Sequence, residues 1–167
     1  VPCGILEGED DKVIIFGAHH DTVYNGPGAI DDTSGTATVL EIARQFALLA
    51  EELGEPKHTM KFCTWGGEEE GLHGSKAWVD KYAESLKDNL IVYINLDMNH
   101  VDIDPERGNG LTLFGNYQSD VDHIERITEK FKAERSDLAN KYDITIRTLD
   151  GEKNSATGMP YNSDHGP

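Results

Sequence analysis

The sequence has few cysteines, no long apolar run and no excess of positive charge, and each lack excludes a class of protein. Two cysteines in 167 residues, Cys3 and Cys63, are too few for a disulfide scaffold. No apolar stretch approaches the ~20 residues of a membrane-spanning helix. Lysine and arginine number 15 against 31 aspartates and glutamates, which leaves a net charge of −16. We therefore expect neither nucleic acid nor an anionic membrane as a partner.

What the sequence contains is typical of a globular protein. Hydrophobic residues make up 37% and charged residues 28% of the chain, and its length suits a single domain with a buried core. Both cysteines lie within apolar, strand-like runs, which favours buried free thiols. Two explanations of the excess of acidic residues are compatible with each other: most form a solvated surface, and a few are gathered around bound cations.

Apolar periodicity predicts that strands and helices alternate along the chain. We predict strands at 1–8, 11–18, 59–65, 90–98, 110–115 and 142–149, and helices from Thr33 to about Ala50, at 76–86 and from about Asp120. The nearly continuous apolar run at 90–98 is typical of a strand that is buried on both faces. This order predicts an α/β sandwich whose sheet is mostly parallel, with an antiparallel hairpin formed by the first two strands.

Acidic residues and histidines follow three of the predicted strands where each strand ends. "HHD" (19–21) follows the strand at 11–18, "GGEEEG" (66–71) follows that at 59–65, and Asp97 ends the apolar run "LIVYINL" (90–96). In open α/β sheets, ligands bind in the crevice outside the carboxyl ends of the strands. We therefore expect the three clusters to converge in space.

Imidazole nitrogens together with carboxylate oxygens are the ligands of first-row divalent metals, of which zinc is the commonest in hydrolases. Taken singly, each candidate has an ordinary alternative, because "EEE" suits a solvated charge run and "DD" suits a helix N-cap. Asp97 is more telling, since a carboxylate that ends an apolar strand needs a partner. The residues alone do not decide between the candidates: His19 or His20, Asp21, Asp31, Asp32, Glu68, Glu69, Glu70, Asp97 and His165.

Five motifs follow one another along the chain: "HHDTV", "GPGAIDDTSGTATVLEIAR", "FCTWGGEEEGLHGS", "INLDM" and "SDH". Together, and in this order, they resemble the dinuclear zinc aminopeptidases of the bacterial leucyl aminopeptidase type, a family of zinc exopeptidases that includes glutamate carboxypeptidase-like enzymes. The resemblance implies a three-layer α/β/α sandwich around a mixed, mostly parallel sheet, as in the phosphorylase/hydrolase-like fold. It also implies one catalytic domain over 1–167 that lacks the family's last strand and helix.

The resemblance also implies a ligand set for two zinc ions. His19 and Asp97 would bind the first ion, Glu69 and His165 the second, and Asp31 would bridge them. His20 and Glu70 fall on variable positions of the motifs, and the Asp31–Asp32 peptide bond is expected to be cis. Because His165 lies near the end of the chain, we expect the second zinc site to be weak or empty.

Two catalytic roles follow from the same resemblance. Glu68 would act as the general base that takes a proton from a water held between the zinc ions, and Asp21 would orient the imidazole of His19. The implied reaction is hydrolysis of the N-terminal peptide bond of a peptide substrate. Tyr161 is a candidate donor to the oxyanion.

Several alternatives remain open at this stage. One is a glutaminyl cyclase-like acyltransferase with a single zinc, and others are a carboxypeptidase or dipeptidase of the same family and a non-catalytic, receptor-type relative. A calcium-stabilised acidic domain is disfavoured by the two histidines. The family favours a secreted or periplasmic location, while the substrate side chain and the oligomeric state are undetermined. In the family the first and third strands are not neighbours, which would place Cys3 and Cys63 too far apart to form a disulfide.

Overall fold

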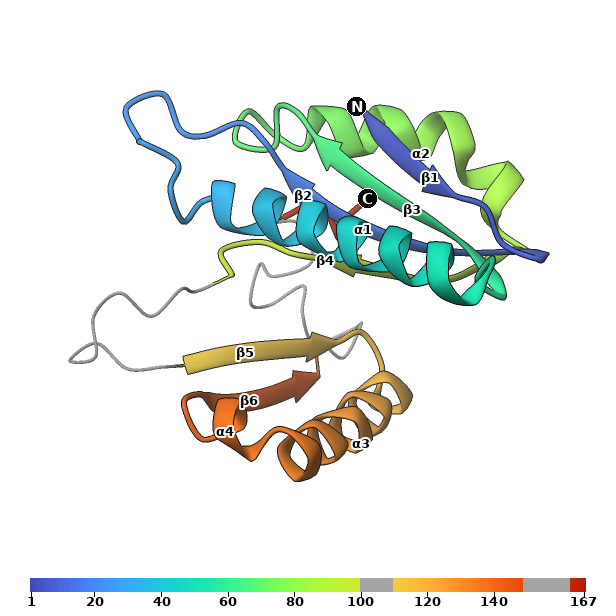
Figure 1. Cartoon of the computed structure of the whole chain (residues 1–167). Helices are drawn as coiled ribbons and strands as arrows, with labels where there is room; N and C mark the ends of the chain where they lie inside the picture. The colour runs from blue at the N-terminus through green and yellow to red at the C-terminus, as the bar shows by residue number, and fades with distance from the viewer. Residues whose placement is uncertain (100–109, 149–162) are drawn as a thin grey trace. The chain divides into compact units, whose positions relative to one another are not determined.

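The computed structural model describes residues 1–99, 110–148 and 163–167, and the chain divides into two compact units. The first unit comprises Val1–Asn99 and Ser163–Pro167, and the second lies within 100–162 (Figure 1). The expectation of a single domain over 1–167 stays a prediction. Tyr161, the candidate oxyanion donor, lies outside the described residues.

A four-stranded sheet forms the centre of the first unit, in the order β1-β3-β2-β4. The strands are β1 (Cys3–Leu6), β2 (Asp10–His19), β3 (His58–Trp65) and β4 (Leu90–Asn95). β2 runs parallel to both β3 and β4, so the predicted mostly parallel sheet is confirmed. The predicted hairpin of the first two strands is wrong, because β1 pairs with β3 in antiparallel orientation.

Two helices cover opposite faces of this sheet, as Figure 1 shows: α1 (Thr33–Leu53) and α2 (His73–Leu86). Side chains alternate between the faces of a strand, so the sheet contributes to two separate cores. The core under α1 contains Ala18, Val39, Met60 and Phe62, and the core under α2 contains Val13, Ile15, Cys63, Trp65 and Leu86. The first unit is therefore the three-layer α/β/α sandwich that the sequence predicted.

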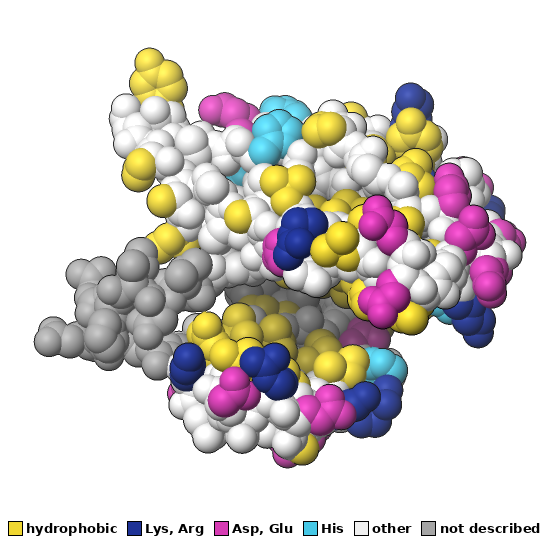
Figure 2. Space-filling view, in the orientation of Figure 1, with side chains coloured by type: hydrophobic (Ala, Val, Ile, Leu, Met, Phe, Trp, Pro, Cys, Tyr) yellow, Lys and Arg dark blue, Asp and Glu magenta, His cyan; other side chains and the backbone are white. Residues whose placement is uncertain are grey.

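The outer surface of α1 is mixed rather than purely polar. Acidic and hydrophobic side chains alternate over this helix in Figure 2. Its exposed leucines are Leu40, Leu48, Leu49 and Leu53. Apolar side chains therefore extend around α1 beyond the face that packs on the sheet.

β4 is the outermost strand of the sheet, which contradicts the expectation that it is buried on both faces. Leu90, Ile91, Val92 and Ile94 are each between 37% and 49% exposed. An apolar run is buried only where other layers cover both faces of its strand. Within the described residues, β4 has a partner strand, β2, on one edge alone, so it lies at the border of the sheet.

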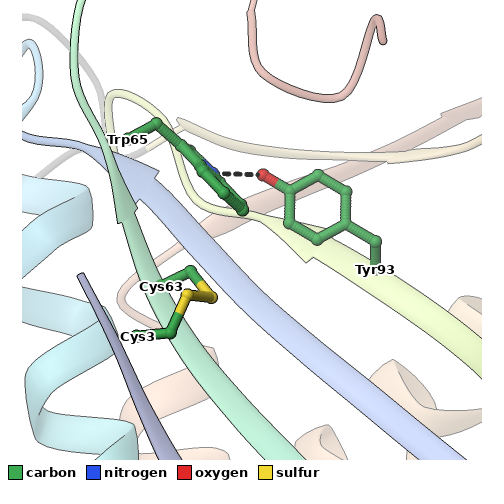
Figure 3. Close-up of a disulfide and its surroundings, with 4 residues drawn as sticks. All are labelled: Cys3, Cys63, Trp65 and Tyr93. Carbon is green, nitrogen blue, oxygen red and sulfur yellow. Dashed lines mark hydrogen bonds between the residues drawn. A yellow bond between two sulfur atoms is a disulfide. The ribbon is translucent and has the colours of Figure 1, made fainter. Parts of the chain in front are cut away.

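Cys3 and Cys63 form a disulfide, so the expectations of free thiols and of strands too distant to bridge are both wrong. The two cysteines face each other across the β1–β3 pair, with their Cα atoms 4.1 Å apart (Figure 3). The physical reason is the strand order: β1 lies directly beside β3, and no other strand separates them. The bond ties the N-terminal edge strand to the centre of the sheet.

Asp32 joins three parts of the first unit through its buried carboxylate, which is 1% exposed. Oδ1 accepts hydrogen bonds from the backbone N–H of Gly35 at 2.9 Å, which caps α1, and of Met98 at 3.1 Å, beyond β4. Oδ2 accepts from the backbone N–H of His19 at 3.2 Å, at the end of β2. Satisfying three buried donors with one side chain fixes the start of α1 against the strand ends.

The second unit contains a parallel pair of strands, β5 (Gly110–Gly115) and β6 (Asp143–Thr148), connected through α3 (Gln118–Glu134) and α4 (Ser136–Ala139). Parallel neighbours require such a crossover, and α3 packs on both strands. Within α3, Val121 is buried and Ile127 is 54% exposed. None of the helices in the described part of the chain has the length and apolar character of a membrane span.

Reduction of the Cys3–Cys63 disulfide should lower the free energy of unfolding by about 2–4 kcal/mol, because the bond restricts the unfolded chain. The cysteines are separated by 60 residues in sequence, so the closed loop is long. Urea unfolding with and without a phosphine reductant measures the effect, and the double variant Cys3→Ala/Cys63→Ala should not respond to reductant. An unchanged wild-type midpoint in reductant would contradict the account.

Asp32→Ala should lower the free energy of unfolding by about 2–4 kcal/mol, because it removes a helix cap and leaves buried N–H groups without an acceptor. Thermal and urea unfolding followed by circular dichroism measure the loss. Asp80→Ala, on the exposed side of α2, is the matched control and should change stability by less than about 0.5 kcal/mol. Equal stability of the two variants would show that the Asp32 contacts do not stabilise the fold.

Candidate metal centre

The candidate residues lie at the carboxyl ends of three parallel strands. β2 ends at His19, β3 ends at Trp65 shortly before Glu68, and β4 ends at Asn95 shortly before Asp97. Because β2 is parallel to both of its neighbours, these ends lie at the same edge of the sheet. The predicted convergence of the three clusters is therefore present in the structure.

His19 is the centre of this cluster, with a side chain that is only 1% exposed. Its Nε2 lies 3.0 Å from Asp31 Oδ1, 3.7 Å from Asp97 Oδ1 and 3.9 Å from Glu68 Oε2. On the other side of the ring, Nδ1 lies 3.1 Å from the main-chain oxygen of Asp21. One ring nitrogen thus contacts the backbone, and the other faces carboxylates from three separate segments.

The charges around His19 hold its imidazole in the protonated form. Burial lowers the pKa of His19, but the contact with Asp97 and the charges of Asp32, Asp97 and Glu68 outweigh burial and raise the pKa to about 10. A proton on His19 thus neutralises part of the cluster's negative charge. A divalent cation bound at Nε2 would have to displace that proton.

Asp21 connects the loop after β2 with the loop after β3. Its Oδ1 accepts a hydrogen bond from the backbone N–H of Glu68 at 3.1 Å, and its Oδ2 accepts one from that of Glu69 at 3.2 Å. Its carboxylate lies 3.7 Å from His19 Nδ1, farther than its own main-chain oxygen. Asp21 therefore positions the two glutamates as well as the histidine.

The three consecutive glutamates have different environments. Glu68 has a side chain that is 10% exposed, and burial, together with the charges of Asp164 and Asp97, raises its pKa to about 7. Glu69 Oε1 accepts a hydrogen bond from the backbone N–H of Val23 at 3.1 Å. Glu70 is exposed. A carboxylate with a pKa near neutrality is suited to accept and release a proton at physiological pH.

The neighbouring aspartates of the "DD" pair also differ. The Asp31–Asp32 peptide bond is cis, as expected. Asp31 is 42% exposed and faces His19, whereas both oxygens of Asp32 accept backbone hydrogen bonds. Burial raises the pKa of Asp32 to about 6, despite the hydrogen bonds from Gly35 and Met98.

Asp97 lies partly buried at the end of β4, with a side chain that is 20% exposed. Its Oδ2 accepts a hydrogen bond from the Ser163 hydroxyl, while Oδ1 faces His19. Burial alone would raise the pKa of Asp97, but the contact with His19 and the hydrogen bond from Ser163 lower it, and so does the charge of His165. Asp97 therefore remains ionised within the cluster.

Two groups of side chains offer atoms close enough to hold a metal ion, with all atoms of a group within 4.8 Å of one another. One group is His19, Asp32 and Asp97, and the other is His19, Glu68 and Glu69. Neither of these groups, drawn from the described residues, includes Asp31 or His165. His165 is close enough to lower the pKa of Asp97, and its role as a ligand stays a prediction.

Asp164 is a buried carboxylate of the cluster that sequence reasoning missed. It is 4% exposed, and among the described residues neither oxygen has a hydrogen-bond partner. Burial raises the pKa of Asp164. Its position in "SDH" was the available signal, but an aspartate beside a candidate ligand does not reveal its own burial.

The chain matches proteins of known family over nearly its whole length. The sequence profile described as peptidase family M28 matches residues 3–167. An aminopeptidase of Pseudomonas aeruginosa is 38% identical over 154 residues, and the match covers 84% of this chain. A probable glutamate carboxypeptidase of Arthroderma benhamiae is 41% identical over 96 residues, 57% of this chain.

A solved structure supports the same relationship. BSAP, a zinc aminopeptidase from Bacillus subtilis, superposes with a TM-score of 0.65 at 25% identity, over 87% of this chain and 33% of the other. This chain spans 26% of the Pseudomonas relative and 13% of the Arthroderma relative. The family profile, the matched relatives and the shared fold agree, and the chain belongs to peptidase family M28.

Proposed function

We propose that this chain carries the dinuclear zinc centre of an aminopeptidase, which hydrolyses the N-terminal peptide bond of a peptide. The observation that carries the proposal is the convergence of His19, Asp31, Glu68, Glu69 and Asp97 at one edge of the sheet. His19 and Asp97 are the proposed ligands of one ion, Glu69 and His165 those of the other, and Asp31 is the proposed bridge.

The chemistry of these residues fits zinc. An imidazole combined with carboxylates is a mixed nitrogen and oxygen donor set, which suits zinc better than calcium. The buried carboxyl group of Asp164, without a hydrogen-bond partner in the described residues, adds a further acidic group to a cluster that already contains Glu68 and Asp97. Buried charges require compensation, and bound cations supply it.

The protein's own residues account for the proton transfers of the proposed reaction. Two zinc ions, when bound, would lower the pKa of a shared water and polarise the carbonyl of the substrate. Glu68 then accepts the proton of the attacking water and delivers it to the departing amine. Asp21 keeps Glu68 in place through the Glu68 backbone N–H. His19 has to be deprotonated at Nε2 before it can bind a metal.

The proposal also specifies which end of the peptide is hydrolysed. The relatives named aminopeptidase and zinc aminopeptidase match 84% and 87% of this chain, which supports release of N-terminal residues. The relative named probable glutamate carboxypeptidase has the higher identity, 41%, over a shorter segment. Carboxypeptidase activity is therefore the second candidate.

The protein that contains this chain should hydrolyse aminoacyl p-nitroanilides, lose that activity on chelation and regain it when zinc is added. N-acetylated anilides should not be hydrolysed, because the proposed substrate has a free amine. Release of p-nitroaniline measures both. Cleavage only of N-blocked peptides with a free C-terminal glutamate would favour the carboxypeptidase. Absence of hydrolysis of every free-amine substrate by the zinc-loaded protein would overturn the aminopeptidase proposal.

Glu68→Gln should lower kcat by about 10²–10⁴-fold, because the amide cannot accept the proton, while zinc content stays at the wild-type level. Glu70→Gln is the matched control, since Glu70 is the exposed glutamate of the same run and should retain wild-type kcat. Steady-state kinetics and metal analysis on the same preparations give both readouts. Wild-type turnover in Glu68→Gln would remove Glu68 from the role of general base.

A further inference from the structure

A continuous chain of hydrogen bonds runs from the core under α2 to Asp97. Trp65 Nε1 donates to the Tyr93 hydroxyl at 2.8 Å, a bond that Figure 3 shows beside the disulfide. The Tyr93 hydroxyl donates to Asn95 Oδ1 at 2.7 Å, and Asn95 Nδ2 donates to Ser163 Oγ at 2.7 Å. The Ser163 hydroxyl donates to Asp97 Oδ2. We call these four bonds the Tyr93–Ser163 relay.

The direction of the relay is determined by its two ends. The indole N–H of Trp65 can only donate, and the ionised carboxylate of Asp97 can only accept. Between these ends, Tyr93 and Ser163 each have a single hydroxyl proton. Each hydroxyl must therefore donate to the next group along the relay, in the direction of Asp97. Asn95 must then turn its oxygen to Tyr93 and its amide nitrogen to Ser163. No other assignment of donors satisfies all four bonds.

The start of the relay is held rigidly by the core. Trp65 is 3% exposed and packs edge-on against Trp78, with ring centroids 5.6 Å apart. Gly17 lies against the Trp65–Tyr93 bond, and a Cβ at that position would lie 2.5 Å from Trp65 Nε1 and 2.7 Å from the Tyr93 oxygen. Only glycine leaves room for this bond. Burial raises the pKa of Tyr93 well above its ordinary value, so the hydroxyl keeps its proton.

The end of the relay selects which oxygen of Asp97 faces the candidate metal centre. Oδ2 accepts the hydroxyl of Ser163, and Oδ1 remains 3.7 Å from Nε2 of His19. Without the donor, the carboxylate could rotate about its Cβ–Cγ bond and exchange its two oxygens. Partners of this kind, which hold a ligand in place, affect metal affinity or activity by about 10- to 100-fold when they are removed.

We propose that Tyr93 and Asn95 are positioning residues, which act through Ser163 to hold Asp97 with Oδ1 toward the metal centre. This proposal rests on the proposed function, because it assigns Asp97 as a zinc ligand. It extends the centre by three side chains that do not contact the metal, two of them from β4 and one from the segment 163–167. The relay also links the packing of Trp65 in the core under α2 to the orientation of Asp97 in the first proposed zinc site.

The test compares Tyr93→Phe and Ser163→Ala with the wild-type protein, using zinc itself as the probe. Zinc affinity is measured by competition with a chromophoric chelator, and kcat and KM are measured on an aminoacyl anilide. Tyr82→Phe is the matched control, because Tyr82 packs on Trp78 in the same aromatic cluster but has no side-chain bond in the relay. Unfolding midpoints are recorded for all four proteins.

We expect both relay variants to bind one of the zinc ions about 10- to 100-fold more weakly and to lose kcat at saturating zinc, with KM changed by less than about twofold. Tyr82→Phe should match the wild type in zinc affinity and kcat. A purely structural role would lower only the unfolding midpoint, so wild-type zinc affinity and kcat in Tyr93→Phe would overturn the proposal, whatever Ser163→Ala shows. If Tyr93→Phe does not fold, Asn95→Leu, which removes the amide of the relay, decides in its place. Failure of the wild-type protein to bind zinc would overturn the proposed function and this proposal with it, whereas zinc-binding variants with wild-type kinetics would overturn this proposal alone.

Discussion

Mutual repulsion among the carboxylates around His19 is the constraint on which the rest of the first unit depends. Asp31, Glu68 and Asp97 approach the same imidazole nitrogen within 3.9 Å, and each comes from a different segment of the chain. Like charges at such distances separate unless the backbone holds them or a cation joins them. The pKa of about 10 for His19 shows how strongly the cluster favours positive charge at its centre. In the zinc-loaded protein, we expect the metal ions to take over that charge.

The fold meets this constraint by assigning different tasks to chemically identical side chains. Asp21 and Asp32 use both of their carboxylate oxygens to bind backbone N–H groups, and so fasten the loops and the start of α1 at the strand ends. The remaining carboxylates are thereby brought to face His19. Because β2 is parallel to both of its neighbours, the loops that carry these carboxylates leave the sheet at the same edge. Asp21 and Asp32 thus hold the backbone with both carboxylate oxygens, whereas Asp31, a residue of the same charge, is left to face His19.

Sequence reasoning predicts the parts of this picture that local pattern determines. That β2 ends at His19 and β4 ends shortly before Asp97 follows from apolar runs that stop at polar residues, and a common edge follows from parallel pairing. The division of labour between Asp31 and Asp32 is not readable from "DD", because it depends on which backbone donors the folded chain brings near each of them. Asp164 escaped prediction for the same reason, since its burial arises from segments distant in sequence.

The errors in strand pairing have a single cause. The polar turn between the first two strands is typical of a hairpin, but pairing of β1 with β3 joins residues that are about sixty positions apart, and local pattern carries no information about that choice. The disulfide was misjudged because its distance depended on the same strand order. The exposure of β4 follows likewise from its place at the end of the sheet.

The central claim is that the residues around His19 hold two zinc ions bridged by Asp31. Crystals of the zinc-loaded protein, measured on both sides of the zinc absorption edge, test it most directly. The account predicts two anomalous peaks about 3.5–4 Å apart, with His19 and Asp97 at one, Glu69 at the other and Asp31 between them. A single peak, or peaks away from His19 and Asp31, would contradict it.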